Sequence, residues 1–356
     1  MLPGVLVGPA GFLVGLVIGF AVWRARLCSF GAIEDALMGD DWRRAKVFGL
    51  ALGLAILTTQ TLVLTGVFGP DLTTYLPSQI AWVPLAAGAV LFGLGMALVG
   101  TCTFGSLVRL GGGDLRSLII LIIFGAVAYA MSRGVLAPLR IQLVALFAVA
   151  MPGDVASDLP RILDYFGLPS ARLVASVLIG GGLIALALRD SRLRKARRLM
   201  TSGVVLGLAV TAGWVATQTL ADPLDPAIRT QSLTYVAPVG RTFFGLLLNA
   251  VDWRDFGVGS VFGVAVGALI AARHADEFRW NAFDDAFEMR RHLIGALLMG
   301  IGGVLAGGCT IGQGLTAGSL LAITWPVTIG GMIVGARIGI AILVGESLRD
   351  LLLRRN

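Results

Sequence analysis

Most of the chain consists of long apolar runs separated by short polar segments. A helix needs about 20 predominantly apolar residues to cross the hydrocarbon core of a bilayer. Runs near this length are predicted to be membrane-spanning helices: 4–22, 47–68, 82–100, 117–132, 171–188, 201–220 and 326–345. The pattern therefore predicts an all-α polytopic membrane protein.

Some apolar stretches are too short or too interrupted for a complete crossing. Phe104 to Leu110 follows a break in the chain and is predicted to be a re-entrant half-helix, while 134–151 is given no role by its pattern. Residues 273–292 carry charges of both signs and form a mixed-charge amphipathic segment. About nine transmembrane helices are compatible with the runs if the short segments are re-entrant.

The apolar run before Gly100 and the run before Gly307 are copies of one another. Residues 91–105 (LFGLGMALVGTCTFG) and 298–312 (LMGIGGVLAGGCTIG) align without a gap. The same residue type occurs at eight of the fifteen positions: Leu91/Leu298, Gly93/Gly300, Gly95/Gly302, Leu98/Leu305, Gly100/Gly307, Cys102/Cys309, Thr103/Thr310 and Gly105/Gly312. A third cysteine, Cys28, lies in a similar short setting, Cys-Ser-Phe-Gly.

The duplication extends beyond the cysteines, because Thr-Gln-Thr-Leu occurs at 59–62 and again at 217–220. We predict a single transmembrane transport domain over 1–356, with a pseudo-two-fold internal repeat whose halves cover about 1–150 and 170–345. Duplicated halves with broken helices near the membrane centre are typical of secondary transporters. The second half has extra apolar segments near 235–251 and 257–272 and no counterpart of Cys28.

Basic residues predict how the chain is oriented in the membrane, because cytoplasmic loops are enriched in Lys and Arg. The loop 24–46 and the strongly basic run 189–198 are predicted to be cytoplasmic, whereas 70–80 has no Lys or Arg and fits the outer side. The N-terminus is then outside, and the tail with Arg349, Arg354 and Arg355 is cytoplasmic.

Composition narrows the class of protein further. The chain is 56% hydrophobic and 14% charged, which is typical of a membrane protein. Its net charge of +7 arises from arginines beside the apolar runs, so nucleic-acid binding is disfavoured. Three cysteines and two histidines give neither a disulfide framework nor a metal-binding pattern, and no cofactor is expected. No nucleotide-binding G-x-x-x-x-G-K-[ST] loop occurs in the sequence, which disfavours an ATP-driven pump.

The broken helices are the candidate substrate path. The start of a helix exposes unpaired N–H groups at the positive end of its dipole, which attracts anions. Glycines let a ligand approach this backbone closely, and a thiol adds a soft, polarisable sulfur. We therefore expect an anion with a soft sulfur end to pass these candidate residues: Cys28, Cys102, Cys309, Gly100, Thr103, Gly105, Gly308, Thr310, Gly312 and Gln313.

Each feature also has a purely structural interpretation. A cysteine in a membrane helix is most often a small buried hydrophobic residue, and glycines permit close helix packing. Gln60 and Gln218 are expected to make hydrogen bonds between helices, and Arg109 is expected either to meet an anion or to anchor its helix at the interface.

Together, the motifs Arg26-Leu27-Cys28-Ser29-Phe30-Gly31, Gly100-Thr101-Cys102-Thr103-Phe104-Gly105 and Gly307-Gly308-Cys309-Thr310-Ile311-Gly312-Gln313-Gly314 resemble those of the YeeE/YedE family. These are bacterial thiosulfate transporters with a sulfur-transport domain, and the likeness covers nearly the whole chain. The resemblance implies an hourglass-shaped protein of the inner membrane with nine spans. It implies that the three cysteines pass thiosulfate along by S–H···S contacts, beside a TusA-like cytoplasmic sulfur-carrier protein.

Other functions remain open at this point. A membrane-embedded thiol sulfurtransferase would take sulfur as a persulfide, but it needs an activating base, and no His or Lys lies near the cysteine motifs in the sequence. A transporter of another sulfur- or selenium-containing anion fits the same pattern. A structural or assembly subunit leaves the cysteine breaks unexplained.

Overall fold

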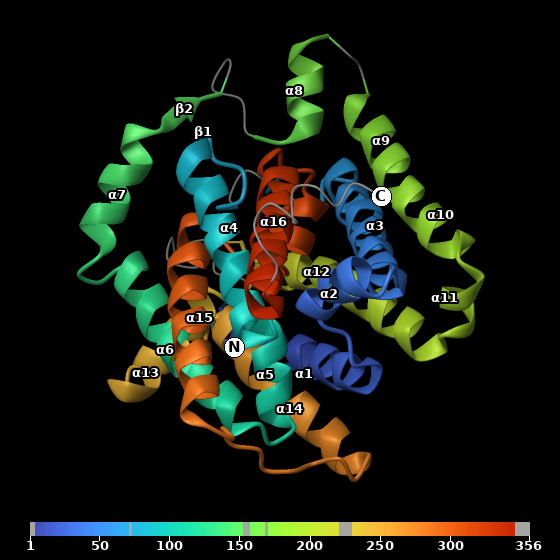
Figure 1. Cartoon of the computed structure of the whole chain (residues 1–356). Helices are drawn as coiled ribbons and strands as arrows, with labels where there is room; N and C mark the ends of the chain where they lie inside the picture. Colours follow the sequence, from blue (N-terminus) through green and yellow to red (C-terminus); the bar gives the residue numbers. More distant parts are fainter. Residues whose placement is uncertain (1–3, 71–72, 152–156, 168–169, 221–229, 346–356) are drawn as a thin grey trace.

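The computed structural model describes residues 4–70, 73–151, 157–167, 170–220 and 230–345 (Figure 1). The described part is almost entirely helical, which confirms the all-α prediction. Eight of its helices or helix pairs are long and apolar enough to cross a membrane. A further long helix, α15 (Ala286–Leu305), begins with several charged residues. The C-terminal tail predicted to be cytoplasmic lies outside the described residues.

The helices of the first part of the chain follow one another with short connections. They are α1 (Val7–Ala25), α2 (Ser29–Met38), α3 (Arg43–Leu64), α4 (Trp82–Val99), α5 (Thr103–Gly111), α6 (Leu115–Ser132), α7 (Ala137–Leu146), α8 (Leu159–Tyr165) and α9 (Ala171–Ala175). Two short strands, β1 (Gln79–Ala81) and β2 (Ala148–Ala150), pair antiparallel. The stretch 134–151 thus becomes a short exposed helix and an edge strand.

The remaining elements include two π-helical segments. They are η3 (Ser176–Gly181), α10 (Gly182–Arg189), α11 (Ser191–Lys195), α12 (Arg197–Leu220), α13 (Ala237–Leu247), α14 (Phe256–His274), α15, η4 (Gly312–Ala317) and α16 (Thr324–Val344). The predicted amphipathic segment 273–292 is instead divided: α14 ends at His274, a non-helical connection follows, and α15 begins at Ala286.

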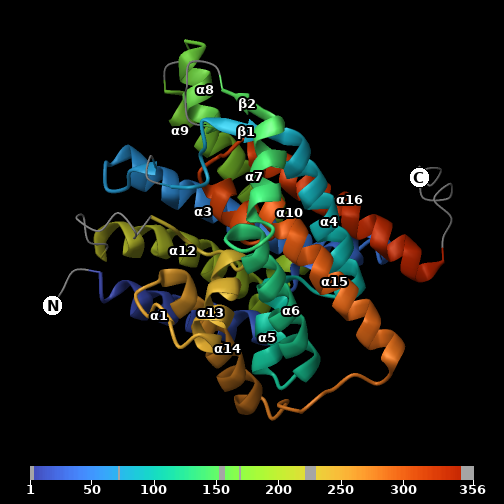
Figure 2. The same ribbon diagram turned by 90° about the vertical axis from the view of Figure 1, so that its left-hand side faces the viewer.

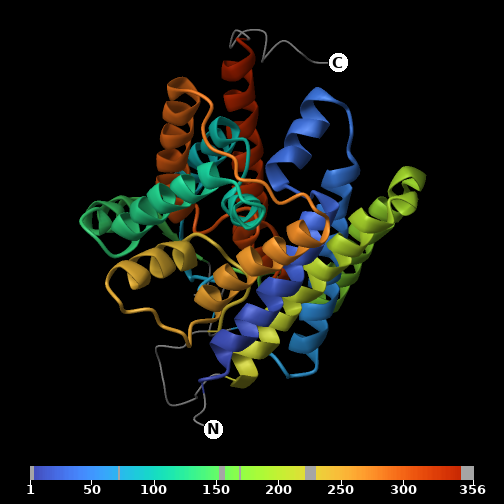
Figure 3. The same cartoon turned by 90° about the horizontal axis from the view of Figure 1, so that it is seen from below.

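Glycines bring α1 and α14 into direct backbone contact. A Cβ on Gly11, Gly15 or Gly19 would collide with the backbone of Phe256, Ser260 or Val264, respectively. The residue numbers increase in the same direction on both helices, so α1 and α14 run parallel, and the contacts recur every four residues. Figure 3 shows them side by side with α12. The second half's extra segment at 257–272 therefore pairs with the first span of the chain.

The two helices that carry the repeated motif, α4 and α15, run antiparallel. Gly88 of α4 lies against Gly302 near the end of α15, whereas Gly95 lies against Gly295 nearer its start. Figure 2 shows the two helices side by side. The duplicated motif is therefore present in two opposite orientations, which is the arrangement of an inverted-topology repeat.

Each of these two helices ends at a glycine in the left-handed conformation. The φ angle is 74° at Gly100 and 71° at Gly307. A second helical segment then begins after each break: α5 after Cys102, and a turn leading into η4 after Cys309. Only glycine adopts such angles without strain, so these residues allow the chain to change direction inside the protein.

Packing of α1 on α14 generates a first prediction. In Gly15→Ala the new Cβ would stand 2.9 Å from Ser260 Cα, so the helices must separate. Overpacking of this kind costs about 1–3 kcal/mol. We expect a lower midpoint of thermal unfolding in detergent.

The matched control is Gly330→Ala on α16, where no described atom lies within 4 Å of the added Cβ. Its midpoint should stay the same or rise, because alanine favours a helix over glycine. Equal midpoints for the two variants would show that the α1–α14 contact is not tight.

A candidate path lined by three cysteines

The cysteines of the repeated motif have the same local geometry. Cys102 precedes α5, and its Sγ accepts a hydrogen bond from the backbone N–H of Gly105 at 3.4 Å. Cys309 follows the second break and precedes η4, and its Sγ accepts one from Gly312 N–H, also at 3.4 Å. Each thiol therefore caps the half-helix that follows it, satisfying one of the N–H groups that a helix start leaves unpaired.

Cys28 contacts the second cysteine motif, that of Cys102. It lies between α1 and α2, after Arg26 turns the chain with a φ of 48°. Its Sγ is 3.4 Å from Thr101 Oγ1, and its side chain also interacts with that of Cys102. Two thiols from separate motifs therefore meet at the end of α4.

A hydroxyl pair joins the first motif to the third. Ser29 Oγ lies 2.9 Å from Thr310 Oγ1, and Ser29 also interacts with the Cys102 side chain. The Ser29–Thr310 contact connects residues that are 281 positions apart in the sequence. The structure thus gathers all three cysteine motifs in one place, as expected if they act together.

Two cavities approach this meeting point from opposite ends of α14. We call them the outer and inner cavities, after the sides that the charge pattern predicts. The outer cavity has a volume of about 870 Å³, contains Asp255 and Val258 from the start of α14, and reaches Gly307 and Gly308 beside Cys309. The inner cavity, of about 540 Å³, is bordered by Asp276 just beyond the end of α14.

The inner cavity reaches Cys28 itself. Its wall also contains Thr101, Gly105 and the Arg109 side chain. Arg109 Nη2 donates a hydrogen bond to the Gly100 carbonyl at 2.9 Å. Arg109 therefore helps to satisfy the end of α4 while presenting positive charge to the inner cavity.

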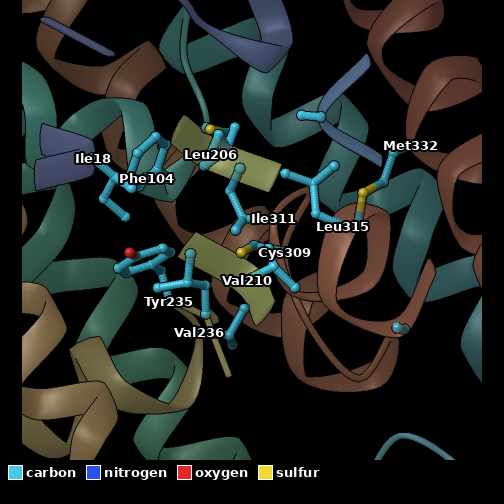
Figure 4. Packing of buried hydrophobic residues seen from close by; sticks show 14 of the residues in the cluster. Ile18, Phe104, Leu206, Val210, Tyr235, Val236, Cys309, Ile311, Leu315 and Met332 are labelled. Carbon is cyan, nitrogen blue, oxygen red and sulfur yellow. The ribbon is translucent and has the colours of Figure 1, made fainter. Parts of the chain in front are cut away.

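Between the cavities the path is closed. Cys102 and Cys309 are 1% and 0% exposed, whereas Cys28 is half-buried. Figure 4 shows Cys309 among the side chains of Ile311, Val210 and Tyr235. The closure consists of thiols, hydroxyls and apolar groups, and a substrate can pass only if these side chains move.

Several predicted residues have polar groups without partners in the described part of the chain. Gln313 is 5% exposed and its Oε1 accepts no hydrogen bond there, and the same holds for the hydroxyl of buried Thr103. By contrast, Gln60 makes the expected interhelical contacts: its Nε2 donates to Ser319 O at 2.9 Å, and its Oε1 accepts from Arg172. Gln218 accepts from Thr230 in the connection after α12.

The sequence analysis missed three polar residues at this site. Ser29 follows Cys28 directly and could have been selected by analogy with Thr103 and Thr310. Tyr75 and Thr234 come from connections outside the repeat. Since neither belongs to a recurring motif, only the tertiary structure brings them to the path.

The fold and the path together define a helical membrane transport protein with two oppositely oriented broken helices. The sequence profile of the family described as Sulphur transport matches residues 24–338. The chain therefore belongs to this family, the YeeE/YedE proteins, as its three motifs indicated.

Two curated relatives align with almost the entire chain. One is the thiosulfate transporter TsuA of Escherichia coli K12, 28% identical over 340 residues, with 90% of each chain covered. The other is the thiosulfate transporter TsuA of Spirochaeta thermophila, 28% identical over 329 residues, covering 88% of this chain and 92% of the relative. The residues matched by the family profile, 24–338, include both halves and all three cysteine motifs.

Unequal burial of the thiols generates a second prediction. In variants that keep one cysteine and replace the other two by serine, a small water-soluble maleimide should react about tenfold faster with Cys28 than with Cys309, because access limits thiol reactivity. The measurement is the rate of mass increase in purified protein. Faster labelling of Cys309 would show that the outer side of the path is the open one.

Proposed function

We propose that the protein takes up thiosulfate across the bacterial inner membrane, along a path in which Cys309, Cys102 and Cys28 make successive S–H···S contacts with it. The observation that supports this proposal is the meeting of the three cysteine motifs through the Cys28–Thr101 and Ser29–Thr310 contacts, with one cavity reaching Cys28 and another reaching Gly308 beside Cys309. The names of the two relatives agree with this substrate.

The character of the path suits an anion with a soft end. Each thiol offers a polarisable sulfur and a weak donor, so no single contact binds the ion strongly enough to retain it. Conduction needs this balance, because a site must be favourable enough to enter and weak enough to leave. A hard oxyanion such as sulfate would be better matched by arginine forks, which are absent from the described closure.

The orientation and the partner belong to the same proposal. With the N-terminus outside and the C-terminus cytoplasmic, the cavity at Cys28 faces the cytoplasm. A TusA-like sulfur carrier would then meet thiosulfate or its products at that cavity, whose wall contains Arg26, Arg44 and Arg279 as well as Glu34 and Glu277. We propose that transport itself involves no covalent step.

Replacing the thiols tests the path. Cys102→Ser and Cys309→Ser keep a group that can cap the half-helix but remove the soft sulfur. Losing one contact of about 1 kcal/mol should lower the initial rate of thiosulfate uptake about fivefold at subsaturating concentration. The measurements are uptake in proteoliposomes and thiosulfate-dependent growth with sulfate uptake blocked.

Ser202→Ala is the control, because Ser202 is buried on α12 and borders neither cavity. Full uptake by a variant lacking all three thiols would reduce the cysteines to packing residues. No uptake by the parent chain would direct the search to other sulfur- or selenium-containing anions.

Isotope position separates transport from sulfur transfer. In a transferase, a cysteine thiolate attacks the terminal sulfur of thiosulfate, the S–S bond of the ion breaks, a persulfide forms and sulfite leaves with the electron pair. Thiosulfate labelled at either the terminal or the sulfonate sulfur should therefore enter vesicles at equal rates if the protein is a transporter. Retention of only the terminal label on the protein would establish the transferase.

A further inference from the structure

Two glycines related by the repeat lie beside similar pairs of side chains. A Cβ on Gly105 would overlap Thr101 Oγ1 and stand 3.4 Å from Cys28 Sγ. A Cβ on Gly312 would stand 2.6 Å from Thr234 Oγ1 and 3.2 Å from the Tyr75 hydroxyl. In both halves, therefore, a threonine hydroxyl and a second polar group lie next to the glycine three positions after the cysteine.

Tyr75 thus takes, in the outer half, the place that Cys28 has in the inner half. Its ring packs edge-on against Trp214, with the centroids 6.2 Å apart, and its hydroxyl interacts with Thr234. Both residues border the outer cavity together with Gly307 and Gly308. Where the inner half offers a thiol, the outer half offers a phenol.

The Gln313 amide lies beneath the same glycine turn. A Cβ on Gly307 would stand 2.9 Å from Gln313 Nε2, and one on Gly308 would stand 3.2 Å from Gln313 Cγ. This side chain is buried, and its Nε2 is the N–H donor at the turn, whereas its Oε1, which can only accept, has no hydrogen-bond partner among the described residues. A buried acceptor without a partner is costly and commonly meets water, so Nε2 is the atom that can donate to an oxyanion.

Thiosulfate has two chemically unlike ends. Its terminal sulfur suits a thiol, whereas its three sulfonate oxygens accept hydrogen bonds from O–H and N–H donors. Arg241, the arginine on α13 at this cavity, is paired with Asp255, with Nε 2.8 Å from Oδ2. Tyr75, Thr234 and Gln313 are neutral donors, which can orient a dianion without holding it as firmly as an arginine fork would.

We propose that Tyr75, Thr234 and Gln313 form a subsite for the sulfonate group of thiosulfate, which directs the terminal sulfur of the ion toward Cys309. This inference rests on the proposed function and adds the recognition of the oxyanion end to it. In the outer half, the ion then makes contacts through both its sulfonate group and its terminal sulfur. In the inner half, where Cys28 stands in place of the phenol, it makes contacts through its terminal sulfur.

Substitutions that separate hydroxyl from shape test the subsite. Thr234→Val keeps the branched shape and loses the hydroxyl, whereas Thr234→Ser keeps the hydroxyl and loses a methyl group. We expect Thr234→Val and Tyr75→Phe each to raise the KM for thiosulfate about fivefold, with little change in kcat, and Thr234→Ser to stay close to the parent. The measurement is the concentration dependence of labelled thiosulfate uptake in proteoliposomes.

Matched controls come from the wall of the same cavity. Tyr129→Phe removes a phenol whose ring stacks on Phe244, and Thr230→Val removes a hydroxyl bonded to Gln218. Both should keep the parent KM. Unfolding midpoints within the range of these controls would show that the variants fold normally.

The outcomes distinguish the two proposals. A parent chain that does not take up thiosulfate contradicts the proposed function. A parent that does, with Tyr75→Phe and Thr234→Val indistinguishable from the controls, overturns the subsite alone. A larger defect in Thr234→Ser than in Thr234→Val also overturns it, because shape and not the hydroxyl would then be what matters.

Discussion

A helix broken inside a membrane protein leaves backbone N–H and C=O groups that neither lipid nor apolar side chains can satisfy. The structure meets this constraint twice in the same way, because Cys102 and Cys309 each accept the N–H of the residue three positions on. The carbonyl ends of the preceding helix are treated similarly: Arg109 donates to Gly100 O, and His292 lies 3.1 Å from Val99 O. Of these capping residues, Arg109 also borders the inner cavity, and Cys309 lies next to Gly308, which borders the outer one.

The glycines of the neighbouring helices follow from the same constraint. Broken segments can exist only where protein surrounds them, and this requires closely packed long helices. Gly15 and Gly263 place α1 and α14 in backbone contact, and Gly93 and Gly335 do the same for α4 and α16. Close contact of this kind replaces the hydrophobic driving force that is absent between helices in lipid. Of the two motif helices, α4 is held against α16 in this way, and α15 packs on α4 itself through Gly95 and Gly302.

The sequence predicted the local features well and the long-range ones poorly. The long apolar runs predicted the membrane-spanning helices, and the repeated glycine–cysteine motif predicted the two breaks and the half-helix after Cys102. The structure contains all of these features. The opposite orientation of α4 and α15 could not be predicted from the repeat, because the amino-acid sequence of the second copy is the same whichever way it is oriented in the membrane. The division of the mixed-charge segment 273–292 into a helix end, a connection and a helix start was not predicted, because mixed charges are compatible with a surface helix and with a charged loop. Tyr75 could not be found, since it comes from a connection with no counterpart in the repeat.

The two halves of the proposed path differ in the polar groups that lie beside the glycine after each cysteine. Around Gly312 the polar neighbours are two hydroxyls, whereas around Gly105 they are a hydroxyl and the Cys28 thiol. In the proposed function, an anion with one hard and one soft end would meet two hydroxyls beside Gly312, and a hydroxyl and a thiol beside Gly105. The inner cavity adds positive charge from Arg109, so its match to the oxyanion end would come from charge and not from a phenol. The hydroxyl pair of Ser29 and Thr310, which lies where the motifs meet, marks the boundary between these two environments.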